Sequence, residues 1–233
     1  LCGSINFAKR DIVKDLTGKT AIVTGGRVKI GYETAIRLLK NNCKVIVTSR
    51  FVDDCLERYK KDPDYHKFKD NLLIYQLNMF NSRNIMRFIE YVYSKFDHLD
   101  YLINNAAQTI RRPEQFYQHV IEKYDQSNEL IDGDKRIVHR DEDELKYISF
   151  TTPQLMLGYD KSEINKLFPE NEVDIYGQQI DLREKNSWIL ELDDINVEEL
   201  AEVYIVNAIA PFILCSKFKQ LMTKTGNNLS WII

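Results

Sequence analysis

The sequence predicts a doubly wound α/β fold with a parallel sheet, and three observations support this prediction. Short β-branched or apolar runs alternate with helical periodicity through the N-terminal half of the chain. The first of these runs enters a glycine turn that opens directly into a helical pattern. Polar residues then follow the later runs, and in a parallel sheet the carboxyl ends of the strands face the ligand. The alternation therefore predicts ligand binding at one edge of a single sheet.

The N-terminal elements follow from local patterns. The first strand, Lys-Thr-Ala-Ile-Val-Thr, is apolar, and the second, which ends at Ser49, is rich in β-branched residues. Asn41 and Asn42 end the first helix, Asp62 and Pro63 end the second, and a third begins at residue 81 or 82 because Asn and Ser are good caps. Strands are expected at 19–24, 43–49, 71–77 and 99–103, with helices at 31–41, 52–61 and 81–96.

The regular alternation stops at about residue 108 and resumes only after residue 187. We interpret this stretch as a large insertion that carries small elements of its own, since a structureless loop of this length is rare in a compact domain. Within it we expect helices at 113–124 and 162–168 and a hairpin arm at 176–183. The charge-dense run 132–144 is most simply a solvated loop, with partner binding as the alternative.

The C-terminal part predicts one long helix over 198–222, in which Pro211 should cause a kink or a local break. A turn at 226–228 then leads into a fifth strand at 229–233. We therefore expect residues 1–16 to be a lead-in and 17–233 to be one domain, truncated after strand five. Because the chain lacks an initial Met and stops inside a strand, we expect it to be a piece of a longer protein.

Composition excludes some classes of function. Of the 233 residues, 44% are hydrophobic and 29% charged, and a net charge of −3 gives no general basis for nucleic-acid binding. No uninterrupted apolar run reaches the roughly 18 residues that a membrane span needs, so none is expected. The four scattered cysteines favour an intracellular, reducing compartment, with the organelle unknown.

A metal site is not expected. The four histidines share no metal-ligand spacing, and we expect each on the surface or in a loop. Cys2 could be the last ligand of a zinc ribbon that lies upstream, but a stray thiol is the simpler interpretation.

Four segments resemble the short-chain dehydrogenase/reductase superfamily in the order of that family. They are 24–31 (Thr-Gly-Gly-Arg-Val-Lys-Ile-Gly), 77–78 (Leu-Asn), 104–107 (Asn-Asn-Ala-Ala) and 206–212, which contains Val-Asn and Ala-Pro-Phe. The first segment, followed by Tyr32, resembles a subgroup with a long insertion before the Val-Asn helix. The resemblance covers about 17–107 and 188–233. It implies a Rossmann fold that binds a nicotinamide dinucleotide.

The glycine turn departs from the family pattern at Lys29, where the family has its middle glycine. That glycine lets the backbone approach the diphosphate closely. Lys29 could crowd this site, pair with a phosphate, or be a solvated surface residue like its neighbour Arg27. Two cations at a helix N-terminus are unfavourable by about 0.3–1 kcal/mol each unless an anion is present, which favours the phosphate interpretation.

The residue after the second strand bears on the choice of cofactor. An acid about 20 residues past the glycines holds the ribose of NAD, whereas an arginine suits the 2′-phosphate of NADP. Here Arg50 follows Ser49, and the first acid is Asp53. We therefore expect Arg50 and Arg27 to select NADP(H) over NAD(H), although Arg50 could also be an ordinary loop cation. The expected cofactor-binding residues are Thr24, Gly25, Arg27, Lys29, Ile30, Gly31, Ser49, Arg50, Asn78, Asn104 and Ala106.

The resemblance also assigns roles to three asparagines. Asn78 stands where the family usually has the Asp that bonds the adenine amino group, and Asn104 with Ala106 would lie beside the adenosine ribose. Asn207 matches the helix Asn of the catalytic tetrad, which holds a water linked to the catalytic lysine; the alternative is a role in the helix kink. The other tetrad members, Ser, Tyr and Lys, are expected beyond residue 233.

Two hypotheses for function follow. The first is an NADP(H)-dependent oxidoreductase acting on an unidentified carbonyl or alcohol. The second is a non-catalytic Rossmann subunit, with a structural or nucleotide-sensing role in a larger assembly or homo-oligomer. Lys29, Asn78 and the insertion favour the second hypothesis, whereas Asn207 and the nucleotide motifs favour the first. A third possibility is a working enzyme whose insertion is a partner-binding arm.

Overall fold

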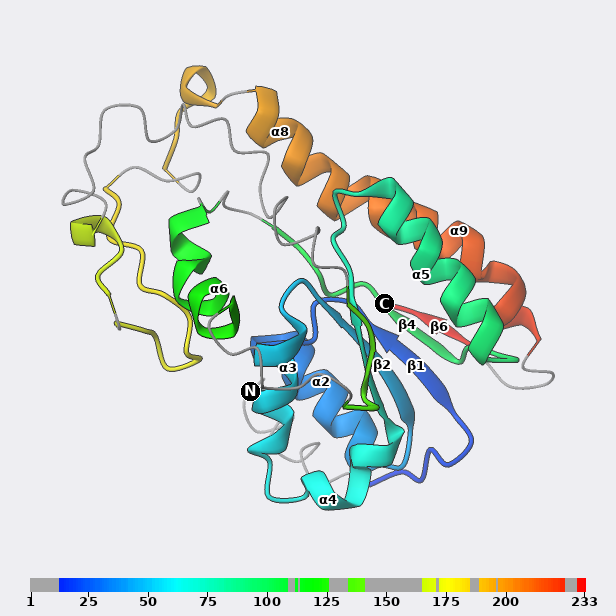
Figure 1. The fold of residues 1–233 in the computed structure, drawn as a ribbon. Helices are drawn as coiled ribbons and strands as arrows, with labels where there is room; N and C mark the ends of the chain where they lie inside the picture. The colour runs from blue at the N-terminus through cyan, green and yellow to red at the C-terminus, as the bar shows by residue number, and fades with distance from the viewer. Residues whose placement is uncertain are drawn as a thin grey trace, which may run out of the picture.

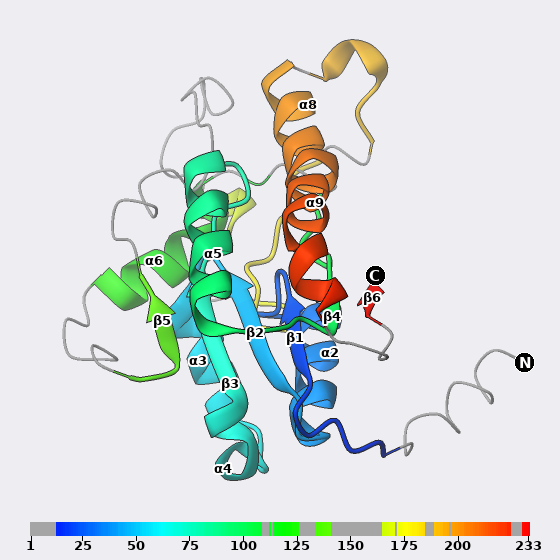
Figure 2. The same cartoon turned by 90° about the vertical axis from the view of Figure 1, so that its right-hand side faces the viewer.

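The computed structural model describes residues 13–108, 112, 114–125, 134–140, 165–170, 172–184, 189–195, 197–224 and 230–233. Its centre is a parallel sheet in the order β5-β3-β2-β1-β4-β6. Figures 1 and 2 show helices on both faces of this sheet. The strands are β1 (Thr20–Val23), β2 (Lys44–Ser49), β3 (Leu72–Gln76), β4 (Tyr101–Ile103), β5 (Ile137–His139) and β6 (Trp231–Ile232). The predicted doubly wound α/β fold is confirmed.

Alternation along the strands builds a core on each face of the sheet. Ala21 and Val23 of β1 face one core, where they pack with residues of α2 (Lys29–Lys40) and α3 (Val52–Lys60). Ile22 between them faces the other core, with residues of α5 (Ser82–Lys95) and α9 (Ala210–Thr223). The strands are buried on both sides, so their carboxyl ends have fixed positions. Between α3 and β3 lie α4 (Tyr65–Phe68) and the 3₁₀ turn η1 (Lys69–Asn71).

Local signals explain where the N-terminal helices begin and end. Asn81 caps α5, because its side-chain oxygen accepts from the backbone N–H groups of Arg83 and Asn84. Helix α3 ends at Lys60, before Pro63, as predicted. Helix α2 begins at Lys29, two residues earlier than expected, and its N-cap Val28 makes no side-chain capping bond.

The insertion contributes a strand that the sequence did not predict. Residues Ile137–His139 form β5, which pairs in parallel with β3 at the outer edge of the sheet. Part of the run 132–144 is therefore sheet rather than solvated loop. His139 lies in this strand and stacks on Tyr75, with ring centroids 4.4 Å apart, so it is no loop residue. The rest of that run lies outside the described residues.

The other predicted elements of the insertion are confirmed in part. The expected helix at 113–124 is a 3₁₀ turn, η2 (Glu114–Tyr117), followed by α6 (Gln118–Asp125). Of the helix expected at 162–168, residues 165–167 are helical and 162–164 lie outside the described residues. The hairpin begins earlier than expected, since Val173 bridges Gln179 in antiparallel fashion. A 3₁₀ turn, η5 (Leu192–Asp194), precedes α8.

The long C-terminal helix breaks where Pro211 predicted it would. Helix α8 (Val197–Tyr204) and α9 are joined by a π-helical turn, η6 (Ile205–Ile209), which contains Asn207. Such turns often accompany functional residues. Although Asn207 and Pro211 argued against a membrane span, Glu199–Thr223 would qualify by length and mean hydropathy alone. One face of this helix, which includes Leu214 and Phe218, is buried in the core beside α5. The predicted turn at 226–228 and Cys2 lie outside the described residues.

Candidate functional site

A cleft of about 690 Å³ opens at the carboxyl ends of β1, β2, β3 and β4. Its volume is typical of a site for a small molecule or cofactor. Nine of the eleven predicted cofactor-binding residues line it; the exceptions are Thr24 and Asn104. The lining predicted residues are Gly25, Arg27, Lys29, Ile30, Gly31, Ser49, Arg50, Asn78 and Ala106.

The glycine turn is packed too tightly for side chains. Gly25 has a φ of 66°, and a Cβ there would lie 2.9 Å from the Cα of Ala106. A Cβ on Gly26 would lie 2.6 Å from Val47 on β2. The backbone N–H groups of both glycines point towards Thr48, at 3.4 Å from its hydroxyl and 3.2 Å from its carbonyl oxygen. The donors left for an anion are therefore the first amides of α2, which have no partner within the helix.

Asn105, which was not among the residues expected to bind the cofactor, holds this turn in place. Its side-chain amide donates to the carbonyl oxygens of Thr24 and Gly25, at 3.1 Å each. The hydroxyl of Thr24 in turn accepts from the backbone N–H of Ala106 at 3.0 Å. Thr24 is fully buried, so it supports the cleft without lining it. The place of Asn105 in the polar segment that follows β4 was a signal for a ligand-facing loop, but not for this structural role.

Lys29 adopts the left-handed backbone conformation that a glycine would adopt, with a φ of 53°. This conformation explains why the family pattern has glycine there. Its ammonium lies 3.7 Å from a carboxylate oxygen of Asp174 and 5.2 Å from the centre of the Tyr176 ring. The Lys29 side chain is 47% exposed, so it lies at the rim and does not fill the cleft.

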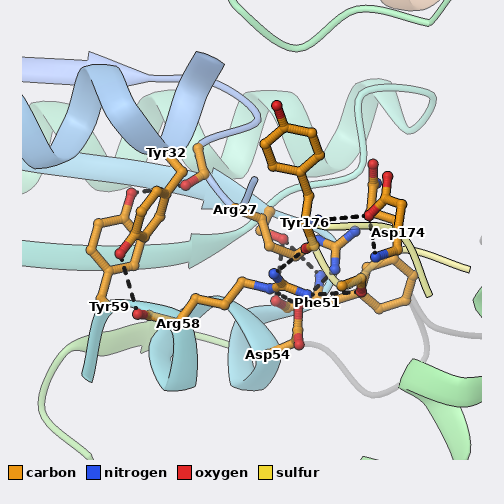
Figure 3. Close-up of polar contacts among 12 residues, drawn as sticks. Arg27, Tyr32, Phe51, Asp54, Arg58, Tyr59, Asp174 and Tyr176 are labelled. Atoms are coloured by element: carbon orange, nitrogen blue, oxygen red, sulfur yellow. Dashed lines mark hydrogen bonds and ion pairs between the residues drawn. The ribbon is translucent and has the colours of Figure 1, made fainter. Parts of the chain in front are cut away.

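Arg27 is paired within the protein. Its guanidinium donates to Asp54 at 2.6 Å and lies over the Phe51 ring at 5.3 Å, as Figure 3 shows. Burial opposes ionisation of Asp54, but Arg27 and Arg58 outweigh it and lower the pKa of Asp54. Carboxylates of this chain thus balance both Arg27 and Lys29. A bound phosphate is therefore not needed to balance these two cations.

Arg58 extends this cluster to the insertion. Its Nε donates to the same Asp54 oxygen at 2.6 Å, while its two terminal nitrogens donate to the carbonyl oxygens of Tyr176 and Gly177, at 2.6 and 3.1 Å. Tyr59, on the same helix, donates its hydroxyl to the Gly26 carbonyl at 2.8 Å. One ionic network therefore joins the glycine turn, α3 and the hairpin of the insertion (Figure 3).

At the end of β2, Ser49 and Arg50 both line the cleft. The Ser49 hydroxyl accepts from the backbone N–H of Phe51 at 3.0 Å and fixes the bend after the strand. The guanidinium of Arg50 faces the ring of Tyr117, 4.6 Å from its centre. Asp53, the first acid after Arg50, pairs instead with Arg140 beyond β5 and does not line the cleft.

The three asparagines occupy different surroundings. Asn78 is buried in the cleft wall, and its side-chain oxygen accepts from the backbone N–H of Phe80 at 3.1 Å. Asn104 does not reach the cleft, because its amide faces the sulfur of Cys215 at 3.5 Å. Asn207 exchanges two hydrogen bonds with the backbone of Gln108, at 2.7 and 2.8 Å. It therefore ties the loop after β4 to the π-helical turn.

No group of three metal-ligand side chains occurs among the described residues. The cleft instead combines a helix N-terminus, a tight glycine turn and a cation at the end of β2. In a doubly wound sheet this arrangement suits the diphosphate and adenosine ribose of a dinucleotide. The collisions that a Cβ on Gly25 or Gly26 would make with Ala106 and Val47 show why this turn has glycine at both positions.

Comparisons with known proteins agree with this geometry. Residues 19–129 match the family model described as short chain dehydrogenase. An uncharacterized protein, R665 of Acanthamoeba polyphaga mimivirus, is 29% identical over 91% of this chain and 43% of its own length. That match runs through most of the insertion. A (+)-neomenthol dehydrogenase from Capsicum annuum is 34% identical over 40% of this chain and 30% of its own length.

Solved structures share the fold. A metagenomic short-chain oxidoreductase in complex with NADP aligns with a TM-score of 0.51 at 15% identity, over 89% of this chain and 58% of its own. A short-chain dehydrogenase from Streptomyces avermitilis also gives 0.51, at 12% identity, over 90% of this chain and 46% of its own. The chain thus spans less than two thirds of these relatives. Residues 19–129 of this chain are thus similar to the short-chain dehydrogenase family, and the chain shares the fold of solved short-chain dehydrogenases.

Proposed function

We propose that this chain is the dinucleotide-binding part of an NADP(H)-dependent oxidoreductase that acts on a carbonyl or alcohol. The position of Arg50 is the observation that carries the cofactor preference. Arg50 lines the cleft directly after β2, where an NAD enzyme would place an acid, and Asp53 is engaged with Arg140. A guanidinium offers a planar set of donors that matches a phosphate group. Two structures with the same fold carry NADP, which is consistent with this preference.

The residues of this chain would bind and orient the cofactor. The first amides of α2 would hold the diphosphate, Arg50 the 2′-phosphate, and Asn78 the adenine end. When bound, the nicotinamide supplies the hydride that is exchanged with the substrate. Arg27 contributes less than the sequence suggested, because Asp54 already binds its guanidinium.

Titration of the full-length protein with NADPH and NADH tests the preference, with Arg50→Ala compared with the wild type. We expect Arg50→Ala to weaken NADPH binding by about 10- to 150-fold, since charge-assisted hydrogen bonds contribute about 1.5–3 kcal/mol. NADH binding should change by less than about threefold. Equal weakening for both nucleotides would contradict 2′-phosphate selection. Arg83→Ala, an exposed arginine on α5, is the matched control.

One observation favours a second candidate, a nucleotide-binding subunit without catalysis. Lys29, which stands where the family has its middle glycine, is engaged by Asp174 and Tyr176 of the insertion at the rim of the cleft. Assays of NADPH oxidation with a panel of ketones and aldehydes separate the two candidates. Tight NADPH binding without turnover of any carbonyl would favour the second.

A further inference from the structure

The described parts of the insertion attach mainly to one half of the cleft. Strand β5 pairs with β3 at the outer edge of the sheet. Helix α6 packs on Phe51 through Val120, and the hairpin is bound by Arg58 of α3. Figure 1 shows α6 and the hairpin on the side of α3, away from α5 and α9. The insertion therefore builds on the side of the cleft formed by β2 and β3.

In a doubly wound sheet this side receives the adenosine half of a dinucleotide. The diphosphate lies at the turn after the first strand, and the adenosine ribose is contacted at the end of the second. The base must then lie beyond Arg50, towards the end of β3. Two side chains of the insertion with aromatic rings, Phe116 and Tyr117, line the cleft together with Arg50 and Asn78.

Tyr117 is held in place as a wall of this region. Its ring lies 5.3 Å from the Phe51 ring and faces the guanidinium of Arg50, 4.6 Å from its centre. The adjacent Phe116 is 2% exposed and anchors the segment, since it packs edge-on against Phe168 and lies under the guanidinium of Arg112 at 4.0 Å. Arg112 in turn pairs with Asp181, which follows the hairpin, at 3.3 Å. Tyr117 thus borders the cleft from a supported segment.

We propose that Tyr117 is a base-binding residue supplied by the insertion, and that its ring and the Arg50 guanidinium together form a cationic aromatic surface for the adenine of the cofactor. This inference rests on the proposed function. Aromatic rings and guanidinium planes both stack on nucleobases, and an electron-rich ring beside a cation keeps the cation in position. The insertion then serves cofactor recognition rather than only the substrate or a partner.

The test uses the full-length protein, three probes and three variants. The probes are NADPH, adenosine 2′,5′-bisphosphate, which carries the base but no nicotinamide, and reduced nicotinamide mononucleotide, which carries no adenine. Tyr117→Phe keeps the ring, Tyr117→Leu keeps apolar packing on Phe51 without a ring, and Tyr117→Ala removes both. Calorimetric titration gives the dissociation constants, and near-ultraviolet circular dichroism checks that each variant is folded.

We expect Tyr117→Leu and Tyr117→Ala to weaken both adenine-containing probes by about 5- to 150-fold, the range for loss of one stacked base. Tyr117→Phe should stay within about threefold of the wild type, and the mononucleotide should bind all four proteins equally. If folded Tyr117→Leu binds the adenine probes as tightly as the wild type, the inference is wrong. If all three probes weaken together, Tyr117 is a packing residue, and the inference is again wrong.

These outcomes are distinct from failure of the proposed function. A wild-type protein that binds neither NADPH nor NADH would overturn the proposed function and this inference together. The wild type could bind NADPH with a selectivity that depends on Arg50, while Tyr117→Leu binds the adenine probes as tightly as the wild type. That result would overturn only the role of Tyr117. If Tyr117→Ala does not fold, the comparison of Tyr117→Leu with Tyr117→Phe still tests whether the ring binds the base.

Discussion

Removal of Arg58 should release the hairpin of the insertion from the nucleotide-binding domain. In the structure its guanidinium makes one bond to Asp54 and two to the carbonyl oxygens of Tyr176 and Gly177. Arg58→Ala abolishes all three. Asp54 keeps its bond to Arg27 at 2.6 Å, so no buried carboxylate is left without a cation. The substitution should therefore mainly weaken the attachment of the hairpin, which loses two hydrogen bonds.

The magnitude follows from the two hairpin bonds. Each hydrogen bond contributes about 0.5–1.5 kcal/mol of net stability. Although the donor is charged, we use this range for neutral hydrogen bonds because water screens the exposed bond to Tyr176. Their loss should weaken hairpin docking by about 1–3 kcal/mol, which raises its opening equilibrium about 5- to 150-fold. Global stability should fall less, because the hairpin carries little of the buried core.

Hydrogen exchange measured by mass spectrometry checks this prediction. Amides of residues 172–180 should exchange about 5- to 150-fold faster in Arg58→Ala, whereas amides of β2 should keep their protection. Arg58→Lys should be intermediate, since one ammonium keeps the charge beside Asp54 but does not span two carbonyl groups. Arg83→Ala is the control. Unchanged exchange of the hairpin in a folded Arg58→Ala protein would show that the bonds to Tyr176 and Gly177 do not hold it.

Two further predictions concern strain and protonation. Lys29→Val should destabilise the protein by about 1–2 kcal/mol in urea unfolding, because a β-branched residue tolerates a φ of 53° poorly; Lys29→Gly should stay within about 1 kcal/mol, and equal stabilities would contradict strain at this position. Burial and the nearby Arg27 lower the pKa of His119, so the native state binds fewer protons than the unfolded state. Its stability should therefore rise with pH through the ordinary histidine range near 6.5, with a flatter profile in His119→Gln. Identical profiles for the two proteins would contradict this.

The parts of the fold that the sequence predicted depend on local signals. The first four strands are short apolar or β-branched runs, and their helices each bury one face through a periodic pattern. Caps or breakers such as Asn81 and Pro63 mark the ends of these helices. Strand β5 was missed because its three residues lie in a charge-dense run and become a strand only by pairing with β3. Pairing of this kind is a long-range contact that no window of neighbouring residues records.

The candidate site was predictable to a similar extent. Gly25, Gly31 and Arg50 line the cleft because their positions after strands are set by the order of the fold. The partners of the cations were not predictable, since Asp54 and Asp174 meet Arg27 and Lys29 only in three dimensions. The role of Asn105 was not predictable either. Asn104 and Asn105 belong to the same motif, but the Asn105 amide bonds the glycine turn whereas the Asn104 amide faces Cys215.

The pairing of Arg27 changes how cofactor selection should be understood. Asp54 is shared by two guanidinium groups, those of Arg27 and Arg58, so the three side chains carry one net positive charge beside the glycine turn. That charge attracts phosphates of either dinucleotide at short range, and it does not distinguish a 2′-phosphate from a diphosphate. Under the proposed function, discrimination between NADP(H) and NAD(H) would then come from a group with both charge and position at the end of β2. Arg50 meets both conditions, since it lies in the bend that the hydrogen bond between Phe51 and Ser49 fixes and its guanidinium faces the Tyr117 ring. The insertion would thus influence selectivity through the orientation of Arg50.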